Sequence, residues 1–168
     1  MKVLFVCMGN ICRSPTAEAV LRKLATENGL AKDLQIDSAG TLGLHAGEPP
    51  DTRAVAHAAQ RGYDLTALRA RKVVSADFEH FDYVVAMDDQ NVRELQAFCP
   101  PHLRKRISLL LDWVGQGARR EVPDPYNGTA QDFELVLDLV ERGCRGLVKQ
   151  LLAERRSRAF RSVGFKEP

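Results

Sequence analysis

The sequence lacks any apolar run that approaches the roughly 20 residues needed to cross a bilayer, so it predicts no membrane span. The apolar run after Lys2 is soon broken by Gly9, Asn10 and Arg13, which argues against a secretion signal. We therefore expect a cytoplasmic protein. Its four cysteines, which are normally reduced in that compartment, are interpreted as buried or reactive thiols rather than as a disulfide framework.

The chain also has little net charge. It carries 24 Lys and Arg against 22 Asp and Glu, a net charge of +2, which is too small to argue for nucleic-acid binding. The segment 154–168 has a net charge of +3, so the remainder carries −1. We expect one domain, 1–153, that is monomeric, and a basic C-terminal tail, 154–168. The tail is interpreted as a solvated, partly frayed terminus, and contact with an acidic partner or a membrane surface is the alternative.

Several common site motifs are missing. The sequence has no G-x-x-x-x-G-K-[ST] and no G-x-G-x-x-G, which argues against the usual nucleotide-binding loops. No Cys/His pair has zinc spacing, and no Ser-His-Asp arrangement suggests itself. We therefore expect neither a metal nor a cofactor.

Apolar segments and helical patterns alternate along the chain. We predict strands over 2–6, 34–38, 81–87 and 106–112, and helices over 14–28, 51–62 and 88–98, followed by a long final helix. One face of that last helix is apolar, with Phe133, Val136, Leu137, Val140, Cys144, Leu147, Val148, Leu151 and Leu152. Strands that alternate with helices predict a three-layer α/β/α domain with a parallel sheet, whose ligands lie beyond the carboxyl ends of the strands.

The first loop after a strand, "VCMGNICRSP", contains the spacing Cys-x5-Arg between Cys7 and Arg13. Successive backbone N–H groups that enter a helix N-terminus form an anion cradle. Gly9 and Asn10 tolerate the backbone turn that such a cradle needs, and the guanidinium of Arg13 matches two phosphate oxygens. The loop therefore predicts a phosphate-binding site after the first strand.

Cys7 would lie at the bottom of this cradle as a nucleophile. Helix N-termini stabilise thiolates, and Ser14 can donate its hydroxyl to the sulfur. Attack on phosphorus would give a cysteinyl-phosphate. The alternative for an isolated cysteine is an inert thiol at the end of a strand, and for Cys12 a packing role is as good an interpretation as a redox role. Because both thiols belong to one tight loop, we also hypothesise a reversible Cys7–Cys12 disulfide after oxidation.

A second loop, "VPDPYNG", supplies a candidate acid for the leaving oxygen. Asp124 lies between two prolines that restrict the direction of the loop, and Tyr126 adds an aromatic wall. Alone, this segment would be interpreted as an ordinary Asp-Pro turn. Together with Cys-x5-Arg, it makes Asp124 the candidate general acid.

The chain closely resembles the low-molecular-weight protein tyrosine phosphatases from about Lys2 to Leu152. The resemblance is carried by "VCMGNICRSPTAEAV", "DSAGT", "GEPPD", "FDYVVAMDDQN" and "DPYNG". It implies a four-stranded parallel sheet and metal-free hydrolysis of phosphotyrosine in a protein substrate. It also implies that Cys7 is the nucleophile, Arg13 the phosphate clamp and Asp124 the general acid and then base.

The resemblance implies further site residues. Ser38 would hydrogen-bond Asn10, and Asp88 would support Arg13. The substrate-binding set would be Met8, Gly9, Asn10, Ile11, Cys12, Ser14, Leu44 and Tyr126. Two departures bear on substrate preference: Leu44 replaces an aromatic residue of many members, and Asn127 replaces a second tyrosine.

Three other functions fit these residues less well. Arsenate reductases on a related fold need two further cysteines, the first at the end of the third strand, where this chain has Met87-Asp88. Phosphoarginine phosphatases tend to carry threonine at the position of Ile11. A phosphate-binding module without catalysis would be expected to lack Cys7 or Asp124.

Overall fold

The computed structural model describes residues 1–115 and 119–163, without the side chains of residues 162 and 163. At its centre, four parallel strands pair in the order β2-β1-β3-β4, which confirms the expected parallel sheet. The strands are β1 (Lys2–Cys7), β2 (Gln35–Gly40), β3 (Tyr83–Ala86) and β4 (Ile107–Leu109).

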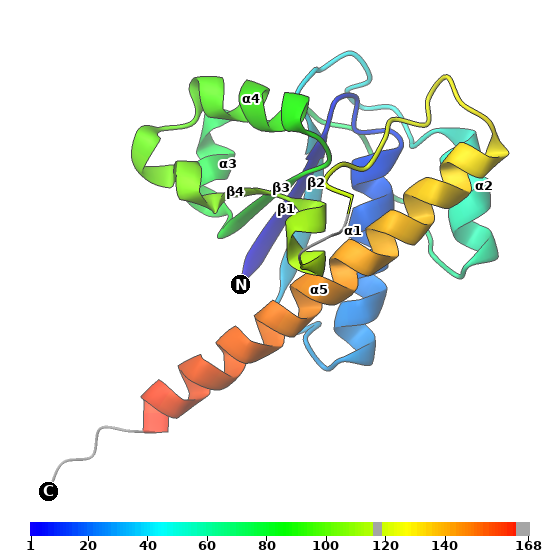
Figure 1. Ribbon diagram of the computed structural model, residues 1–168. Coiled ribbons are helices and arrows are strands. Elements are labelled where there is room, and N and C mark those ends of the chain that lie inside the picture. Colours follow the sequence, from blue (N-terminus) through cyan, green and yellow to red (C-terminus); the bar gives the residue numbers. More distant parts are fainter. Residues whose placement is uncertain (116–118, 164–168) are drawn as a thin grey trace, which may run out of the picture.

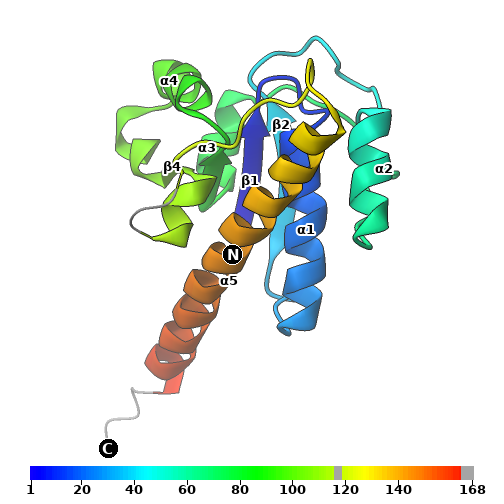
Figure 2. The same cartoon turned by 45° about the vertical axis from the view of Figure 1, so that its right-hand side comes forward.

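Helices cover both faces of the sheet (Figures 1 and 2). One face carries α1 (Arg13–Glu27) and α5 (Ala130–Val163), with α2 (Thr52–Gln60) beside them; the other carries α3 (Ser75–His80) and α4 (Asp89–Phe98). Each face of the sheet packs in its own hydrophobic core, and alternate β1 side chains point into the two cores. Val3 and Phe5 pack in the core that contains α1 and α5, and Leu4 and Val6 pack in the core on the opposite face. The three-layer α/β/α architecture is therefore confirmed.

Side-chain caps begin two of the helices where the sequence suggests. The Asp51 carboxylate accepts from the Arg53 N–H before α2, and that of Asp88 accepts from the Asn91 N–H before α4. Gly29 and Gly62 follow the ends of α1 and α2 with φ of 67° and 77°, in the left-handed region that favours glycine.

The predicted strand 106–112 is wrong beyond Leu109. The Asp112 carboxylate accepts a hydrogen bond from the Leu109 N–H and caps the 3₁₀ helix η2 (Leu110–Val114), whose Leu110 and Leu111 are buried in the core formed with α5. Tertiary burial explains the apolar run there, since a buried helical turn and a buried strand share that pattern.

Other bounds also shift. The second strand continues to Gly40, and the third is confined to Tyr83–Ala86. The short helix α3 and the 3₁₀ helix η1 (Pro101–Arg106) are not among the predicted elements.

The apolar face predicted for the last helix is confirmed. Its residues are buried along α5, except for Leu152, which is half-buried against the same core. The helix runs on without a break through the expected boundary at 153/154 as far as Val163. The part of the tail expected to fray is therefore helical up to that residue, and 164–168 lie outside the described residues. Within the described ranges, no helix is long and apolar enough to cross a membrane.

Close packing of α5 on η2 depends on two glycines. A Cβ built on Gly146 would lie 2.1 Å from the carbonyl oxygen of Trp113, and one on Gly143 would lie 2.5 Å from Leu110 Cγ. The first neighbour is backbone and cannot rotate away.

We predict that Gly146→Ala destabilises the protein by about 1–3 kcal/mol, because overpacking forces α5 and η2 apart. Helix propensity alone would give the opposite sign, a gain of up to about 1 kcal/mol. Urea unfolding measures the difference, with the exposed Gln150→Ala on the same helix as control. A Gly146→Ala protein as stable as the wild type would contradict this packing.

Candidate active site

The loop after β1 is held against the loop after β2. The Thr41 N–H donates to the Cys7 carbonyl oxygen at 2.9 Å, and the Leu42 N–H to that of Met8 at 3.0 Å. A Cβ on Gly40 would lie 2.7 Å from the Met8 carbonyl oxygen, so only glycine permits this approach. The first loop therefore begins in a fixed direction, from a strand in the interior of the sheet.

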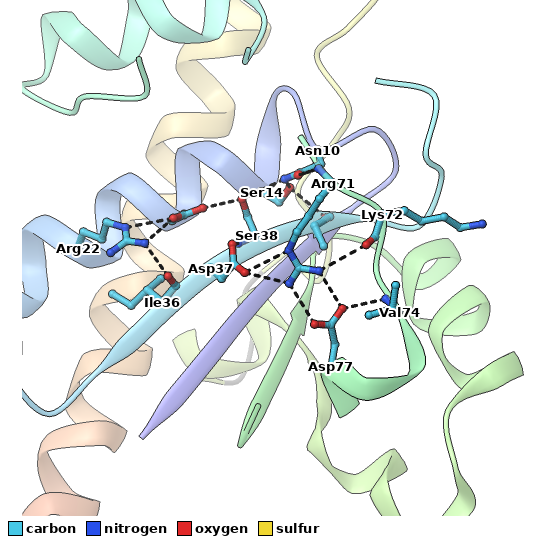
Figure 3. Close-up of polar contacts among 12 residues, drawn as sticks. Asn10, Ser14, Arg22, Ile36, Asp37, Ser38, Arg71, Lys72, Val74 and Asp77 are labelled. Carbon is cyan, nitrogen blue, oxygen red and sulfur yellow. Dashed lines mark hydrogen bonds and ion pairs between the residues drawn. The ribbon is translucent and has the colours of Figure 1, made fainter. Parts of the chain in front are cut away.

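Asn10 fixes the turn of the loop. It is the single non-glycine residue with positive φ, 56°, among those described, and it is 2% exposed. Its side-chain amide donates to Ser14 Oγ at 2.9 Å and to Ser38 Oγ at 3.0 Å, while its oxygen accepts from the Arg71 N–H at 2.9 Å (Figure 3). The expected contact between Ser38 and Asn10 is thus present.

A second layer of polar groups holds these partners. Ser38 Oγ donates to Glu18 Oε2 at 2.7 Å, and the buried Glu18 pairs with Arg22, which also donates to the Ile36 carbonyl. The Ser38–Glu18 and Arg22–Ile36 links join β2 to α1, and the Glu18–Arg22 pair lies within α1, so the network connects the two elements beside the loop. Sequence reasoning missed Glu18, although a glutamate one turn into a helix beside an apolar sheet is a usable signal for a buried partner.

Arg71 is likewise clamped. Its guanidinium bridges Asp37 at 2.9 Å and Asp77 at 3.0 Å, so that the N–H that contacts Asn10 comes from a segment tied to both β2 and α3 (Figure 3). Burial alone would lower the pKa of Arg71, but the two carboxylates raise it and keep the side chain charged.

Cys7 ends β1 beneath the loop and is 2% exposed. Its sulfur lies 3.0 Å from the Ser14 hydroxyl, as expected. Because Asn10 already donates to that hydroxyl oxygen, the Ser14 hydrogen can point to the sulfur. The N-terminus of α1 lies at the end of the same loop, with Arg13 as the first residue of the helix.

Arg13 is buried, with 2% of its side chain exposed, yet both of its terminal nitrogens have hydrogen-bond partners. It donates to Asp88 at 2.6 Å, to the Val122 carbonyl at 3.2 Å and to Asp124 at 3.0 Å. Burial opposes its charge, but nearby Cys7 and Asp124 and the bond to Asp88 hold the pKa of Arg13 above its usual range. The expected support from Asp88 is present, and the direct contact with Asp124 is an addition.

Asp124 lies at the open side of the site, with 42% of its side chain exposed. Its second oxygen accepts from the Tyr126 N–H at 3.2 Å, and Arg53 donates to the Tyr126 carbonyl at 2.9 Å. The Arg53 guanidinium also lies 5.7 Å from the centre of the Tyr126 ring. These contacts fix the loop that carries both residues.

The groups converge on a cavity of about 300 Å³. Its lining comprises Cys7, Met8, Gly9, Ile11, Cys12, Arg13, Leu42, Leu44, His45, Asp124 and Tyr126. Asn10 and Ser14, which the sequence placed in the substrate-binding set, lie behind the loop and are not among the lining residues.

Two lining residues, Leu42 and His45, were missed. Their position just after β2 could have indicated them, because parallel strands end at the same edge of a sheet and the loops that follow them lie side by side. His45 Nδ1 lies 2.7 Å from Glu48, and a Cβ on Gly9 would lie 3.3 Å from the His45 ring, so the ring covers the loop closely. Among the described residues, no group of His, Cys, Asp and Glu is arranged to hold a metal ion.

Chemically, the cavity offers a thiol at its base, a fixed guanidinium, backbone N–H groups at a helix N-terminus and a half-exposed carboxyl group. That set suits capture of an oxyanion and attack by sulfur on its central atom.

Comparisons with known proteins identify relatives over almost the whole chain. Residues 2–157 match the family model described as low molecular weight phosphotyrosine protein phosphatase. A Bacillus subtilis low molecular weight protein-tyrosine-phosphatase is 39% identical over 155 residues, which cover 92% of this chain and 98% of that protein. The human low molecular weight phosphotyrosine protein phosphatase is 39% identical, covering 88% and 94%. A crystal structure of a protein tyrosine phosphatase from Entamoeba histolytica, with Hepes in the active site, superposes with a TM-score of 0.88 at 41% identity, covering 92% and 99%.

Asp88 both caps α4 and pairs with Arg13, so its two roles can be separated. We predict that Asp88→Ala lowers the free energy of unfolding by about 3 kcal/mol, from a lost cap and a lost charged hydrogen bond. Asp88→Asn keeps one acceptor and should lose less. Urea denaturation tests the order, with the half-exposed neighbour Asp89→Ala as control; its carboxylate makes only a surface contact with Arg120, at 3.4 Å, so this variant is expected within about 0.5 kcal/mol of wild type. Equal stability of all four proteins would show that neither contact matters.

Proposed function

The chain belongs to the low molecular weight phosphotyrosine protein phosphatase family, and we propose that it hydrolyses protein phosphotyrosine through a cysteinyl-phosphate intermediate. The observation that carries the proposal is the convergence of Cys7, Arg13 and Asp124 on one cavity. In this mechanism Cys7 is the nucleophile, Arg13 the phosphate clamp and Asp124 the general acid and then the base.

Binding comes first. The phosphate of the substrate enters the cradle of N–H groups, and Arg13 donates to two of its oxygens. A phosphate oxygen offers the guanidinium a new acceptor in place of Asp124, which frees that carboxyl group to carry a proton. The Asp88 contact keeps the guanidinium plane in position throughout.

Two chemical steps follow. The Cys7 sulfur attacks phosphorus while the bond from phosphorus to the phenolic oxygen breaks, and protonated Asp124 gives its proton to that oxygen. Asp124, now a carboxylate, takes a proton from water as the water oxygen attacks the phosphocysteine. Inorganic phosphate leaves and the thiolate returns. Ser14 supports the sulfur each time it carries negative charge.

An aromatic substrate suits the walls of the cavity. Apolar side chains of Ile11, Leu42, Leu44 and Tyr126 line the entrance, and Leu44 and Tyr126 are 77% and 47% exposed. A tyrosine ring can bury its faces against them, whereas the guanidinium of phosphoarginine would be desolvated. Cys99 packs in the core on the opposite side of the sheet from Cys7, which does not favour an arsenate-reductase thiol relay.

We predict that Cys7→Ser abolishes turnover of p-nitrophenyl phosphate and phosphotyrosine peptides, because serine oxygen is a far weaker nucleophile here. Asp124→Ala should slow turnover by roughly 10²–10⁴-fold through loss of the general acid. Cys99→Ser, remote from the cavity, is the control and should retain activity. Steady-state assays with phosphorylated Tyr, Ser and Arg peptides decide the substrate class; full activity in Cys7→Ser would exclude this mechanism.

We also propose that the site is redox-sensitive through Cys12. Peroxide oxidises the Cys7 thiolate to the sulfenic acid and is itself reduced to water; the Cys12 sulfur then attacks the Cys7 sulfur, forming a disulfide and releasing water. Both residues line the same cavity. Burial, and then the charge of Asp51, raises the pKa of the Cys12 thiol, so Cys12 is protonated at neutral pH and must lose its proton to react.

Peroxide-treated wild type should therefore recover activity with dithiothreitol, and Cys12→Ser should recover much less. Because the pKa of Cys12 is raised, disulfide formation should accelerate as the pH rises above neutrality. Peptide mass mapping after trapping at several pH values measures the bond. Equal recovery of both proteins, with no Cys7–Cys12 peptide, would leave Cys12 with a packing role.

We propose that residues 1–153 form the catalytic domain, that the protein acts as a cytoplasmic monomer, and that its partner is a phosphotyrosine-containing protein.

A further inference from the structure

Positive charge is concentrated on the second half of α5. Residues 142–161 contain seven arginines and lysines and one acidic residue, Glu154, a net charge of +6. The whole chain carries +2, so everything outside this segment carries −4. An ordinary solvated surface has positive and negative side chains interspersed, whereas this half of the helix carries almost only positive ones.

Four of these cations form a row on one side of the helix. Arg142, Arg145, Lys149 and Arg156 are separated by three, four and seven residues, the spacing of a single helical face, and all four are exposed. The buried residues of the same stretch, Cys144, Val148 and Leu151 among them, face the core. We call Arg142, Arg145, Lys149 and Arg156, together with Phe160, the basic stripe.

The charges of the basic stripe are largely uncompensated. Arg145 contacts Glu141 at 3.3 Å, but within the described chain the side chains of Arg142, Lys149 and Arg156 have no hydrogen bond or ion pair. The one acid of the segment, Glu154, points elsewhere, since it binds Tyr83 and Arg158. The stripe therefore presents free cations to solvent.

The stripe ends in an exposed aromatic ring. Phe160 follows Arg156 by one helical turn and is 82% exposed, the most exposed large apolar side chain among the described residues. The C-terminal end of α5 extends beyond the sheet and the other helices (Figures 1 and 2). Phe160 belongs to that end of the helix and follows residue 157, where the family match ends. Among the described residues, neither core cluster includes its ring.

We propose that the basic stripe of α5 binds an anionic phospholipid surface, holding the phosphatase peripherally at a membrane. A straight helix of 20 residues is about 30 Å long, so its row of cations can face a flat array of lipid phosphates at once. Phe160 supplies the second element of interfacial binding, an aromatic side chain that enters the boundary between headgroups and acyl chains.

A lipid surface fits these features better than a nucleic acid. The phosphates of duplex DNA follow a helical path around its axis, and its specific recognition relies on groove contacts and on polar side chains beside the cations. The stripe has a linear row of charges, and its terminal residue is apolar.

The test is co-sedimentation of the full-length protein with vesicles. Wild type should bind vesicles of phosphatidylcholine mixed with phosphatidylglycerol, bind poorly to pure phosphatidylcholine, and dissociate at high salt. The variant Arg142→Glu/Lys149→Glu/Arg156→Glu should bind at least about 100-fold more weakly, because each cation contributes roughly fivefold at an anionic surface. Phe160→Ala should weaken binding severalfold, most visibly at high salt.

A matched control reverses three exposed cations elsewhere, Arg93→Glu/Arg104→Glu/Lys105→Glu, and has the same net charge as the stripe variant. It should bind like the wild type apart from a small general charge effect. None of these residues lies in the catalytic cavity, so every variant should hydrolyse p-nitrophenyl phosphate normally. If charge reversal impairs folding, the glutamine variant Arg142→Gln/Lys149→Gln/Arg156→Gln replaces it.

Three results would overturn the proposal: unchanged vesicle binding in the folded stripe variant, equal losses in the stripe and control variants, or tighter binding of wild type to duplex DNA than to the anionic vesicles. Vesicle binding is measured separately from catalysis, so failure here leaves the proposed hydrolysis unaffected.

Discussion

The buried side chain of Asn10 is the constraint on which the site depends. One amide ties the loop after β1 to α1 through Ser14, to β2 through Ser38 and to the segment before α3 through Arg71. Because the backbone at this residue has a positive φ, the turn is held by side-chain hydrogen bonds rather than by a glycine's freedom. The loop is thereby held in one shape by its own contacts, which would leave little ordering to oppose the anion binding proposed for it.

The burial of the Arg13 guanidinium is a second constraint on the fold. Removing Arg13 from water is costly, and the cost is offset only because carboxylate and carbonyl acceptors meet it from separate parts of the chain. The two carboxylates differ in character. Asp88 is mostly buried and also begins α4, so helix packing and guanidinium orientation are coupled. Asp124 is far more exposed, which suits the change of partner that the proposed mechanism requires of it.

Helix α5 combines two surfaces with different roles. Its apolar side completes the core against β1 and α1, with glycines where η2 approaches most closely. The opposite side carries the basic stripe, which starts where the helix is packed on the body and continues past it (Figure 1). A rigid helix anchored in the core can hold such a row straight, whereas a disordered tail of equal charge would lose entropy on ordering.

The sequence by itself determined the candidate residues on which the proposed chemistry rests, and most of the architecture. Cys7, Arg13 and Ser14 are local to one loop, and alternating strand and helix patterns suffice for the layers, because both depend on short-range spacing. Only the tertiary structure decided what depends on distant contacts. It places Leu42 and His45 at the cavity and Arg71 behind Asn10, and it joins Arg13 to Asp124 across more than 100 positions. It also ends β4 at Leu109, since the core against α5 takes the next leucines into a helical turn. The periodicity of the sequence does not indicate such contacts. They arise because parallel strands end at the same edge of the sheet and because side chains remote in sequence pack in the same buried space.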